Sequence, residues 1–228
     1  MIVIILVIIV IGEIVRRRKM SERIDLDFDE LIDTLKAAMG KDKDFEDLVK
    51  LKSDLNREIF IGDIYDGIGK AVDQLICFWN KCDDEKNLSV DERKPIILTI
   101  DSCGGSLLDA FTIIDAINLS KTPVYAYVIG AAFSAGFLIA IACHKRYGYK
   151  HSSYLFHEGS IETGGTSGQF QNQAEFYKNK RLRWIKDHVL ECTKIEEEEY
   201  DKNRREDIWY DAYEALEKGI IDEIIGEN

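Results

Sequence analysis

The sequence predicts a single α/β domain from about residue 58 onward, and three observations indicate this class. Short β-rich runs alternate with helical patterns from there to the C-terminus, which is typical of βαβ architectures. The run KPIILTID at 94–101 is continuously apolar, like strands buried on both faces of a parallel sheet. The chain has 228 residues, 46% of them hydrophobic and only two of them proline, which suits one core of ordinary size.

The first half of this domain contains two strand-then-helix patterns. Residues 58–62, EIFIG, are expected to form the first strand. Polar and apolar residues alternate with helical period over 68–80, so a helix follows. The run at 94–101 is the second strand, and a glycine pair then turns the chain. The amphipathic segment 106–120 is expected to be the second helix.

The second half continues the alternation. PVYAYVIG at 123–130 predicts a strand. The next segment, 131–143, carries no charge over thirteen residues, so we expect a largely buried helix. SSYLFHE at 152–158 predicts another strand. The remaining segments are the glycine-rich ETGGTSG at 162–168, a long polar helix at about 169–199, a helix at 211–218 and a short apolar run at 220–225.

The N-terminal residues differ in character from this domain. Residues 1–15 are almost wholly apolar, but the run is shorter than the roughly 20 residues of a spanning helix and contains Glu13. A basic cluster at 16–19 follows the run, whereas a secretion signal has its charges first. One interpretation is a short membrane anchor with a cytoplasmic basic flank. The other, which the length and Glu13 favour, is a mobile extension or a true start at Met20.

Three regions are therefore predicted along the chain. Residues 20–56 are acidic and helix-prone, which indicates an accessory helical arm. No internal repeat and no change of composition divides the part that follows. The predicted organisation is an apolar and basic segment at 1–19, a helical arm at 20–56 and one domain at 57–228.

Composition excludes several kinds of partner and cofactor. The formal net charge of −12 disfavours nucleic acid, whose phosphates are bound by clustered Lys and Arg. Five cysteines without framework or zinc-site spacing indicate reduced structural thiols. The segment 62–67 looks like the start of a phosphate-binding loop, but Ile68 stands where lysine is required. The carboxylate run at 195–201 is more typical of a solvated helix face than of a metal site. We expect neither cofactor nor metal.

Ser134 lies at a predicted strand-to-helix turn between Gly130 and Gly136. Reactions collect at the carboxyl ends of strands in α/β sheets. A tight turn there can hold a hydroxyl while neighbouring N–H groups stay open, as a nucleophile with an oxyanion hole requires. Ala132 replaces the glycine of the strict elbow pattern, so a helix-capping serine, or a small residue at a crowded helix crossing, is the alternative interpretation.

His157 and a glycine pair complete the candidate site. His157 ends a strand pattern 23 residues after Ser134, where an imidazole could accept the serine proton and return it to a leaving amine. A structural histidine is the alternative. Gly104 and Gly105 follow another strand. A backbone without Cβ atoms can aim an N–H at a developing oxyanion, although an ordinary turn fits the same pattern.

These segments together resemble the Clp protease proteolytic subunit, a family whose fold is related to the crotonase superfamily. The resemblance covers about residues 57–226. It implies a Clp/crotonase-like fold of repeated ββα units, in which ETGGTSG and the long helix after it form the handle that joins two rings and lines the peptide groove. The matching segments are EIFIGDI, LTIDSCGGSLLDAFTIIDAI, VIGAAFSAGFLIA, YLFHEGS and EALEKGIIDEII.

The resemblance assigns roles position by position. It implies that Ser134 is the nucleophile, that His157 is the general base, and that the N–H groups of Gly105 and Ala135 form the oxyanion hole. Alignment back from the C-terminal segment places the family's aspartate on Asn203. An amide there orients the imidazole but supplies no charge. Asp201 is the alternative third member of the triad.

The implied activity is that of a cytoplasmic serine endopeptidase that hydrolyses unfolded polypeptides inside a ring-shaped chamber. The implied partners are copies of the same chain in two stacked seven-membered rings and a hexameric ATP-driven unfoldase, while membrane contact through 1–19 is not favoured. A non-catalytic ring subunit is the alternative, which Asn203 favours and the Ser134 and His157 pair opposes. A crotonase-type coenzyme A thioester enzyme would use the glycine turns without needing Ser134.

Overall fold

The computed structural model describes residues 56–160, 164–203 and 205–226. The predicted segment at 1–19 lies outside the described residues, as does the predicted arm at 20–56 apart from its last residue. Within the described ranges, no helix combines the length and the apolar character that a membrane crossing requires.

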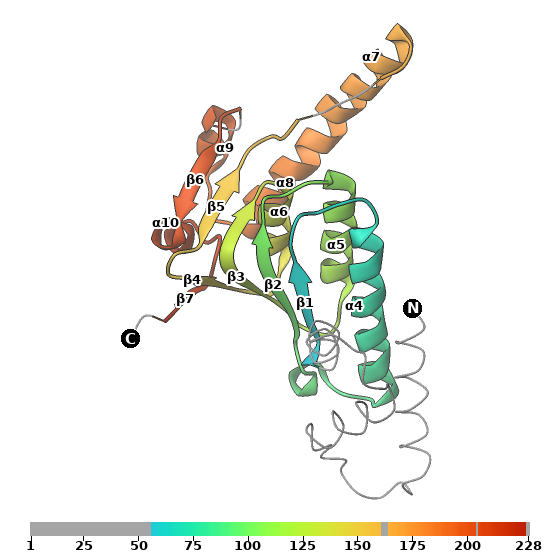
Figure 1. Ribbon diagram of the computed structural model, residues 1–228, viewed down its shortest axis with the longest axis vertical. Helices are drawn as coiled ribbons and strands as arrows, with labels where there is room; N and C mark the ends of the chain where they lie inside the picture. The colour runs from blue at the N-terminus through green and yellow to red at the C-terminus, as the bar shows by residue number, and fades with distance from the viewer. Residues whose placement is uncertain (1–55, 161–163, 204, 227–228) are drawn as a thin grey trace, which may run out of the picture. The chain divides into compact units, whose positions relative to one another are not determined.

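Strands and helices alternate along the described chain (Figure 1). The first half contains β1 (Glu58–Ile61), α4 (Ile68–Glu85), the 3-10 turn η1 (Val90–Glu92), β2 (Ile96–Ser102), α5 (Leu107–Leu119), β3 (Val124–Phe133) and α6 (Ala135–Ala142). The second half contains β4 (Lys145–Tyr149), β5 (Ser153–Phe156), α7 (Ser167–Phe176), the π-helical turn η2 (Tyr177–Arg181), α8 (Leu182–Cys192), α9 (Glu197–Asn203), β6 (Ile208–Asp211), α10 (Ala212–Glu217) and β7 (Glu223–Ile225). The predicted α/β class is confirmed.

The strands of the described chain form one sheet centred on β3. The order β1-β2-β3-β4-β7 is parallel throughout, while β5 pairs in parallel with β3 and antiparallel with β6. β3 changes its neighbour along its length, because residues 125–128 pair with β4 and residues 131–133 pair with β5. The carboxyl end of β3 thus lies beside β5, with β6 as the next strand.

A bulge between β2 and β3 produces this change of neighbour. Ile100 and Ser102, which are two residues apart in β2, pair with Val128 and Ala132, which are four residues apart in β3. Gly130 lies in the bulge, where a Cβ would come within 2.4 Å of Asp101 Oδ1. The same carboxylate oxygen accepts a hydrogen bond from the amide of Ala131 at 2.9 Å. The bulge turns the end of β3 toward β5.

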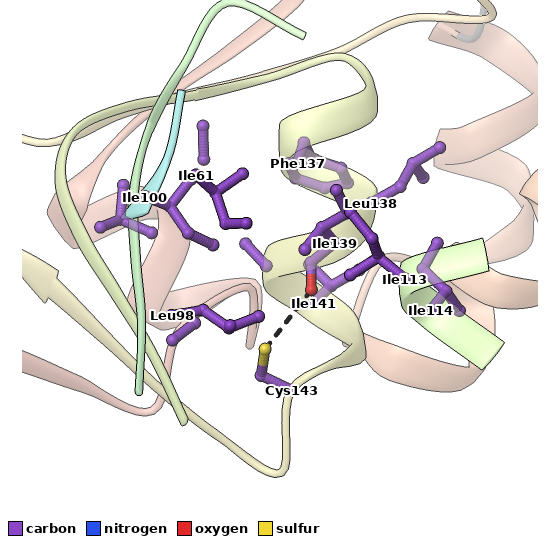
Figure 2. Packing of buried hydrophobic residues seen from close by; sticks show 14 of the residues in the cluster. Ile61, Leu98, Ile100, Ile113, Ile114, Phe137, Leu138, Ile139, Ile141 and Cys143 are labelled. Carbon is purple, nitrogen blue, oxygen red and sulfur yellow. Dashed lines mark hydrogen bonds between the residues drawn. The ribbon is translucent and has the colours of Figure 1, made fainter. Parts of the chain in front are cut away.

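The hydrophobic core lies between the sheet and the helices packed on it (Figure 2). The strands contribute fully buried side chains such as Ile61, Leu98 and Ile100. Residues 135–141 of α6 are all buried, and full burial of a large apolar side chain stabilises a fold by about 1.5–3 kcal/mol. The uncharged helix is therefore buried as predicted. Its side chains in Figure 2 are Phe137, Leu138, Ile139 and Ile141, which lie near Ile113 and Ile114 of α5.

Three differences from the predicted elements affect the candidate site. The helix predicted at 131–143 begins only at Ala135, because β3 continues to Phe133. The helix predicted at 169–199 ends at Cys192 and is interrupted by the π-helical turn η2. β4 and β6 have no counterpart among the predicted elements. Both are short, β4 carries two cations and a glycine, and β6 runs directly into α10.

Candidate active site

Ser134 occupies the turn between β3 and α6 with main-chain angles φ 54° and ψ −116°. A residue other than glycine in such a conformation is strained by about 1–3 kcal/mol, as is found where a strand-to-helix turn exposes a nucleophile. The amide of Ser134 donates a hydrogen bond to the carbonyl of Leu155 at 2.8 Å, so β5 fixes the turn. The hydroxyl forms no capping hydrogen bond with α6. The alternative of a helix-capping serine is therefore wrong.

His157 follows the last residue of β5, and its ring bridges two side chains. Its Nε2 lies 2.8 Å from Ser134 Oγ, and its Nδ1 lies 3.1 Å from Asp207 Oδ1. A carboxylate beside Nδ1 accepts a hydrogen bond from the N–H there, so the proton stays on Nδ1 and Nε2 is free to accept the hydroxyl proton of the serine. The arrangement is that of a serine activated by an oriented base.

Strand pairing brings these three side chains together. β5 is parallel to β3, so the carboxyl ends of both strands meet, and β6 is antiparallel to β5, so its amino end lies at the same place. Ser134 and His157 each come one residue after a strand, and Asp207 comes one residue before one. The predicted convergence of Ser134 and His157 is thus present.

The third position corrects the sequence prediction. Asp207 lies against Nδ1 of His157, where Asn203 or Asp201 was expected. Asp201 instead binds Lys186, whose Nζ lies 2.8 and 2.9 Å from the two carboxylate oxygens. The residues between α9 and β6 have no hydrophobic pattern that fixes their register, so alignment back from the C-terminus was ambiguous.

A signal for Asp207 does exist in the sequence. The motif IWYD directly after Asp207 forms β6, and Phe156 pairs with Ile208. A strand prediction at 208–211, paired antiparallel with 153–156, would have brought Asp207 beside His157. The strand has only four residues, too few for an alternating pattern that predicts a strand.

The glycine pair lies against the nucleophile turn. Gly104 has φ +101°, and a Cβ there would come within 2.8 Å of Ser134 Cβ and 3.3 Å of Ala135 N. Gly105 has φ +136°, and a Cβ there would come within 2.1 Å of the carbonyl oxygen of Ile64. Only glycine fits either position. Ala135 is the first residue of α6, so helix hydrogen bonding leaves its N–H open.

Ser102 supports both turns and was not singled out from the sequence. It is almost fully buried, and its Oγ accepts a hydrogen bond from the amide of Gly104 at 3.1 Å. A Cβ on Gly136 would come within 3.0 Å of that Oγ, so Ser102 also touches the start of α6. The signal is a second polar residue, directly after Asp101, at the carboxyl end of a strand that begins with an apolar run.

An apolar surface lies on the same face of the sheet as His157 and Asp207. Phe133 pairs with Leu155, and Leu155 pairs with Trp209. The rings of Phe133 and Trp209 meet edge to face with centroids 5.0 Å apart. Side chains two residues apart on a strand share a face, which places Leu155 with His157 and Trp209 with Asp207. Phe133, Leu155 and Trp209 therefore line up across three neighbouring strands at the end of the sheet where His157 and Asp207 lie.

Among the described residues, other reactive side chains form neither a metal site nor an activated thiol. In the part of the chain that the structure describes, no three His, Cys, Asp or Glu side chains form a group that could hold a metal ion. The cysteines are free thiols. Burial raises the pKa of the Cys143 and Cys192 thiols, so they are poor nucleophiles at neutral pH.

Comparison with known proteins decides the family. A family model described as Clp protease matches residues 46–228. The chain belongs to the Clp protease family. The resemblance inferred from the sequence is confirmed, and with it the class of enzyme, a serine peptidase of the Clp type.

Relatives in the Clp protease family are about 30% identical to this chain over the aligned residues. The ATP-dependent Clp protease proteolytic subunit 2 of Treponema pallidum is 31% identical over 139 residues, which cover 60% of this chain and 69% of the relative. The subunit of the same name in Corynebacterium efficiens is 29% identical over 178 residues, covering 73% and 88%. A solved structure, that of a point mutant of ClpP1 from Listeria monocytogenes, is 25% identical with a TM-score of 0.64, covering 79% of this chain and 97% of that one.

Proposed function

We propose that this chain hydrolyses peptide bonds of unfolded polypeptides with Ser134, His157 and Asp207 as its catalytic triad. The observation that carries the proposal is the position of the imidazole, with Nε2 at 2.8 Å from Ser134 Oγ and Nδ1 at 3.1 Å from a carboxylate. A nucleophile, a base and a group that orients the base are the parts that acyl transfer requires.

In the proposed first half-reaction, Ser134 Oγ attacks the carbonyl carbon of the scissile bond while its proton passes to His157 Nε2. The Asp207 carboxylate stabilises the imidazolium that forms. The carbonyl oxygen becomes negatively charged and accepts hydrogen bonds from the N–H groups of Gly105 and Ala135. The close approach of the glycine pair to the Ser134 turn supports this assignment. His157 then gives its proton to the leaving amine, and an acyl-enzyme on Ser134 remains.

In the second half-reaction, water attacks the acyl-enzyme. His157 takes a proton from the water and returns it to Ser134 as the ester bond breaks. The product carboxylic acid leaves, and the triad is restored. No step requires a metal ion or a cofactor.

We further propose that residues 57–228 form the peptidase domain and that the protein acts in the cytoplasm as a ring homo-oligomer of two stacked heptamers. Its relatives are named as proteolytic subunits of an ATP-dependent protease, which supports a larger assembly and an ATP-driven partner. A hexameric unfoldase would supply unfolded chains to the chamber. Residues 1–19 and 20–56 are proposed to be an N-terminal segment and a helical arm outside this domain.

Labelling with a fluorophosphonate tests the chemistry directly. The serine oxygen displaces fluoride from phosphorus while the hydroxyl proton passes to the base, so the mass of the intact protein rises by one phosphonyl group. We expect wild-type protein to be labelled and Ser134→Ala protein not to be labelled. Wild-type protein that takes up no probe, or equal labelling of both proteins, would contradict the proposal and favour a non-catalytic subunit.

A further inference from the structure

Tyr177 contacts the main chain directly after His157. Its hydroxyl donates a hydrogen bond to the carbonyl of Glu158 at 2.9 Å. A Cβ built on Gly159 would lie 3.8 Å from the same hydroxyl, so the hydroxyl lies against the peptide unit that joins Glu158 and Gly159. The hydrogen bond connects the long helical segment of α7, η2 and α8 to the chain that leaves β5 (Figure 1).

The local helix geometry at Tyr177 is unusual. Tyr177 is the first residue of η2, a five-residue π-helical turn. A π turn adds a residue to the helix and rotates the side chains after it, and such turns occur often at functional sites. Burial raises the pKa of the Tyr177 hydroxyl, so the group keeps its proton at physiological pH and acts as a donor.

His157 has strand support only on its N-terminal side. The pairing of β5 with β6 ends at Phe156, and the hydrogen bond from Ser134 N reaches Leu155. Residues 157–160 belong to neither a strand nor a helix. Catalytic groups must be held to within about 0.5 Å of their working geometry, so main-chain freedom after Phe156 would move the imidazole away from Ser134 Oγ.

We propose that Tyr177 is a positioning residue that holds the main chain beyond His157 and thereby keeps Nε2 against Ser134 Oγ. It acts through His157 and does not touch the reacting atoms. The inference rests on the proposed function, because it concerns the base of the same triad. It makes the π-helical turn between α7 and α8 part of the support of the catalytic histidine.

The test compares Tyr177→Phe with Tyr149→Phe in the full chain. Both changes remove one hydroxyl and keep the ring, but Tyr149 is exposed and lies on β4, which pairs with residues 125–128 of β3 and not with its carboxyl end. Losing the hydrogen bond of Tyr177 should lower kcat for a fluorogenic peptide and the fluorophosphonate labelling rate by about two- to tenfold. KM and the thermal unfolding midpoint should stay close to wild type, and Tyr149→Phe should match wild type in all four quantities.

Three outcomes overturn the inference while wild-type labelling keeps the proposed function intact. Labelling of Tyr177→Phe at the wild-type rate would show that the hydroxyl positions nothing. A raised KM with unchanged kcat would assign Tyr177 to substrate binding. A loss of activity that follows a lower unfolding midpoint would assign it to stability alone. Wild-type protein without labelling would instead overturn the proposed function, and this inference with it.

Discussion

At the smallest scale, three residues at strand ends form the proposed triad. Ser134 and His157 follow β3 and β5, and Asp207 precedes β6, so sheet pairing sets the separations between their main chains. The side chain of Asp207 is more exposed than that of His157, 59% against 34%. Solvent screens an exposed ion pair strongly, so the value of this contact is to orient the imidazole and to supply charge in the transition state.

Asp207→Asn should lower kcat by about 10²- to 10⁴-fold, because an amide can hold the wrong tautomer of the histidine and cannot stabilise its cation. Asp201→Asn and Asn203→Ala serve as matched variants, since the sequence alone favoured those positions. Both should stay within about threefold of wild type. Steady-state hydrolysis of a fluorogenic peptide measures all three. A larger loss from Asn203→Ala than from Asp207→Asn would restore the triad first predicted.

Gly104→Ala should lower kcat by about tenfold or more, because its Cβ would come within 2.8 Å of Ser134 Cβ and displace the nucleophile. Gly67→Ala is the matched control. Gly67 also has positive φ, +91°, but nothing lies within 4 Å of a Cβ there. Both variants should lose about 1 kcal/mol of stability from backbone strain, seen in urea denaturation. Equal kcat values for the two variants would contradict the close contact at Gly104.

At the scale of elements, α8 contacts α6, the helix that follows Ser134, through one histidine. His188 Nε2 donates a hydrogen bond to the carbonyl of Leu138 in α6 at 2.9 Å, and its Nδ1 lies 3.6 Å from Cys192 Sγ. Burial lowers the pKa of His188 below its ordinary value of 6.5. The ring is therefore neutral in the folded protein at neutral pH, with its proton on Nε2.

Stability should fall as the pH drops below about 6.5, because the unfolded chain then binds a proton at His188 that the folded chain binds only at lower pH. His188→Gln lacks this titration and can still donate to a carbonyl. The free energy of unfolding, measured in urea at about pH 7.5 and about pH 5.5, should decrease more in wild type than in the variant. Equal decreases would mean that His188 is not the group responsible.

A second connection between elements ties α4 to the edge of the sheet. Asp83 is fully buried and accepts hydrogen bonds from Arg57 at 2.6 and 2.7 Å and from Thr122 at 2.8 Å. Burial pushes the pKa of Asp83 upward, but the hydrogen bonds from Arg57 and Thr122 outweigh it and leave the pKa below its ordinary value. The carboxylate is charged at neutral pH and fully partnered.

Asp83→Ala should destabilise the protein by about 3–5 kcal/mol, because it leaves the mostly buried guanidinium of Arg57 without its counter-ion. Glu85→Ala on the same helix removes an exposed carboxylate 3.9 Å from Lys81 and should cost less than about 1 kcal/mol. Urea denaturation at neutral pH compares the two. Similar losses of unfolding free energy in the two variants would show that the Arg57–Asp83 pair contributes no more to stability than an exposed pair.

The elements that the sequence predicts well are those with strong periodicity or continuous burial. β2, β3, α5 and the uncharged α6 follow directly from apolar runs of sufficient length. β4 and β6 are short and rich in polar or aromatic residues, so no pattern marks them. The π-helical turn differs from an α-helix by one added residue, and the spacing of apolar side chains in the sequence is too coarse to predict it. The missed β6 is the reason that Asp207 was missed.

At the scale of the whole molecule, the proposed ring assembly gives a measurable mass. The chain has a mass of 26.1 kDa. Native mass spectrometry should find a particle of two stacked heptamers, and addition of about 1 M salt should not dissociate it if the contacts are mainly apolar. A protein that stays monomeric at all concentrations would contradict the proposed assembly, while leaving the labelling of Ser134 as an independent test.

Downstream of the bulge at Gly130, the two parts of the site are held by different contacts. The serine is locked on both sides, by its own strand and by the carbonyl of Leu155. The proton-transfer half depends on chain segments that continue past the ends of β5 and ahead of β6. A change that displaces either of these segments would therefore move the imidazole or the carboxylate before it moves the hydroxyl of Ser134.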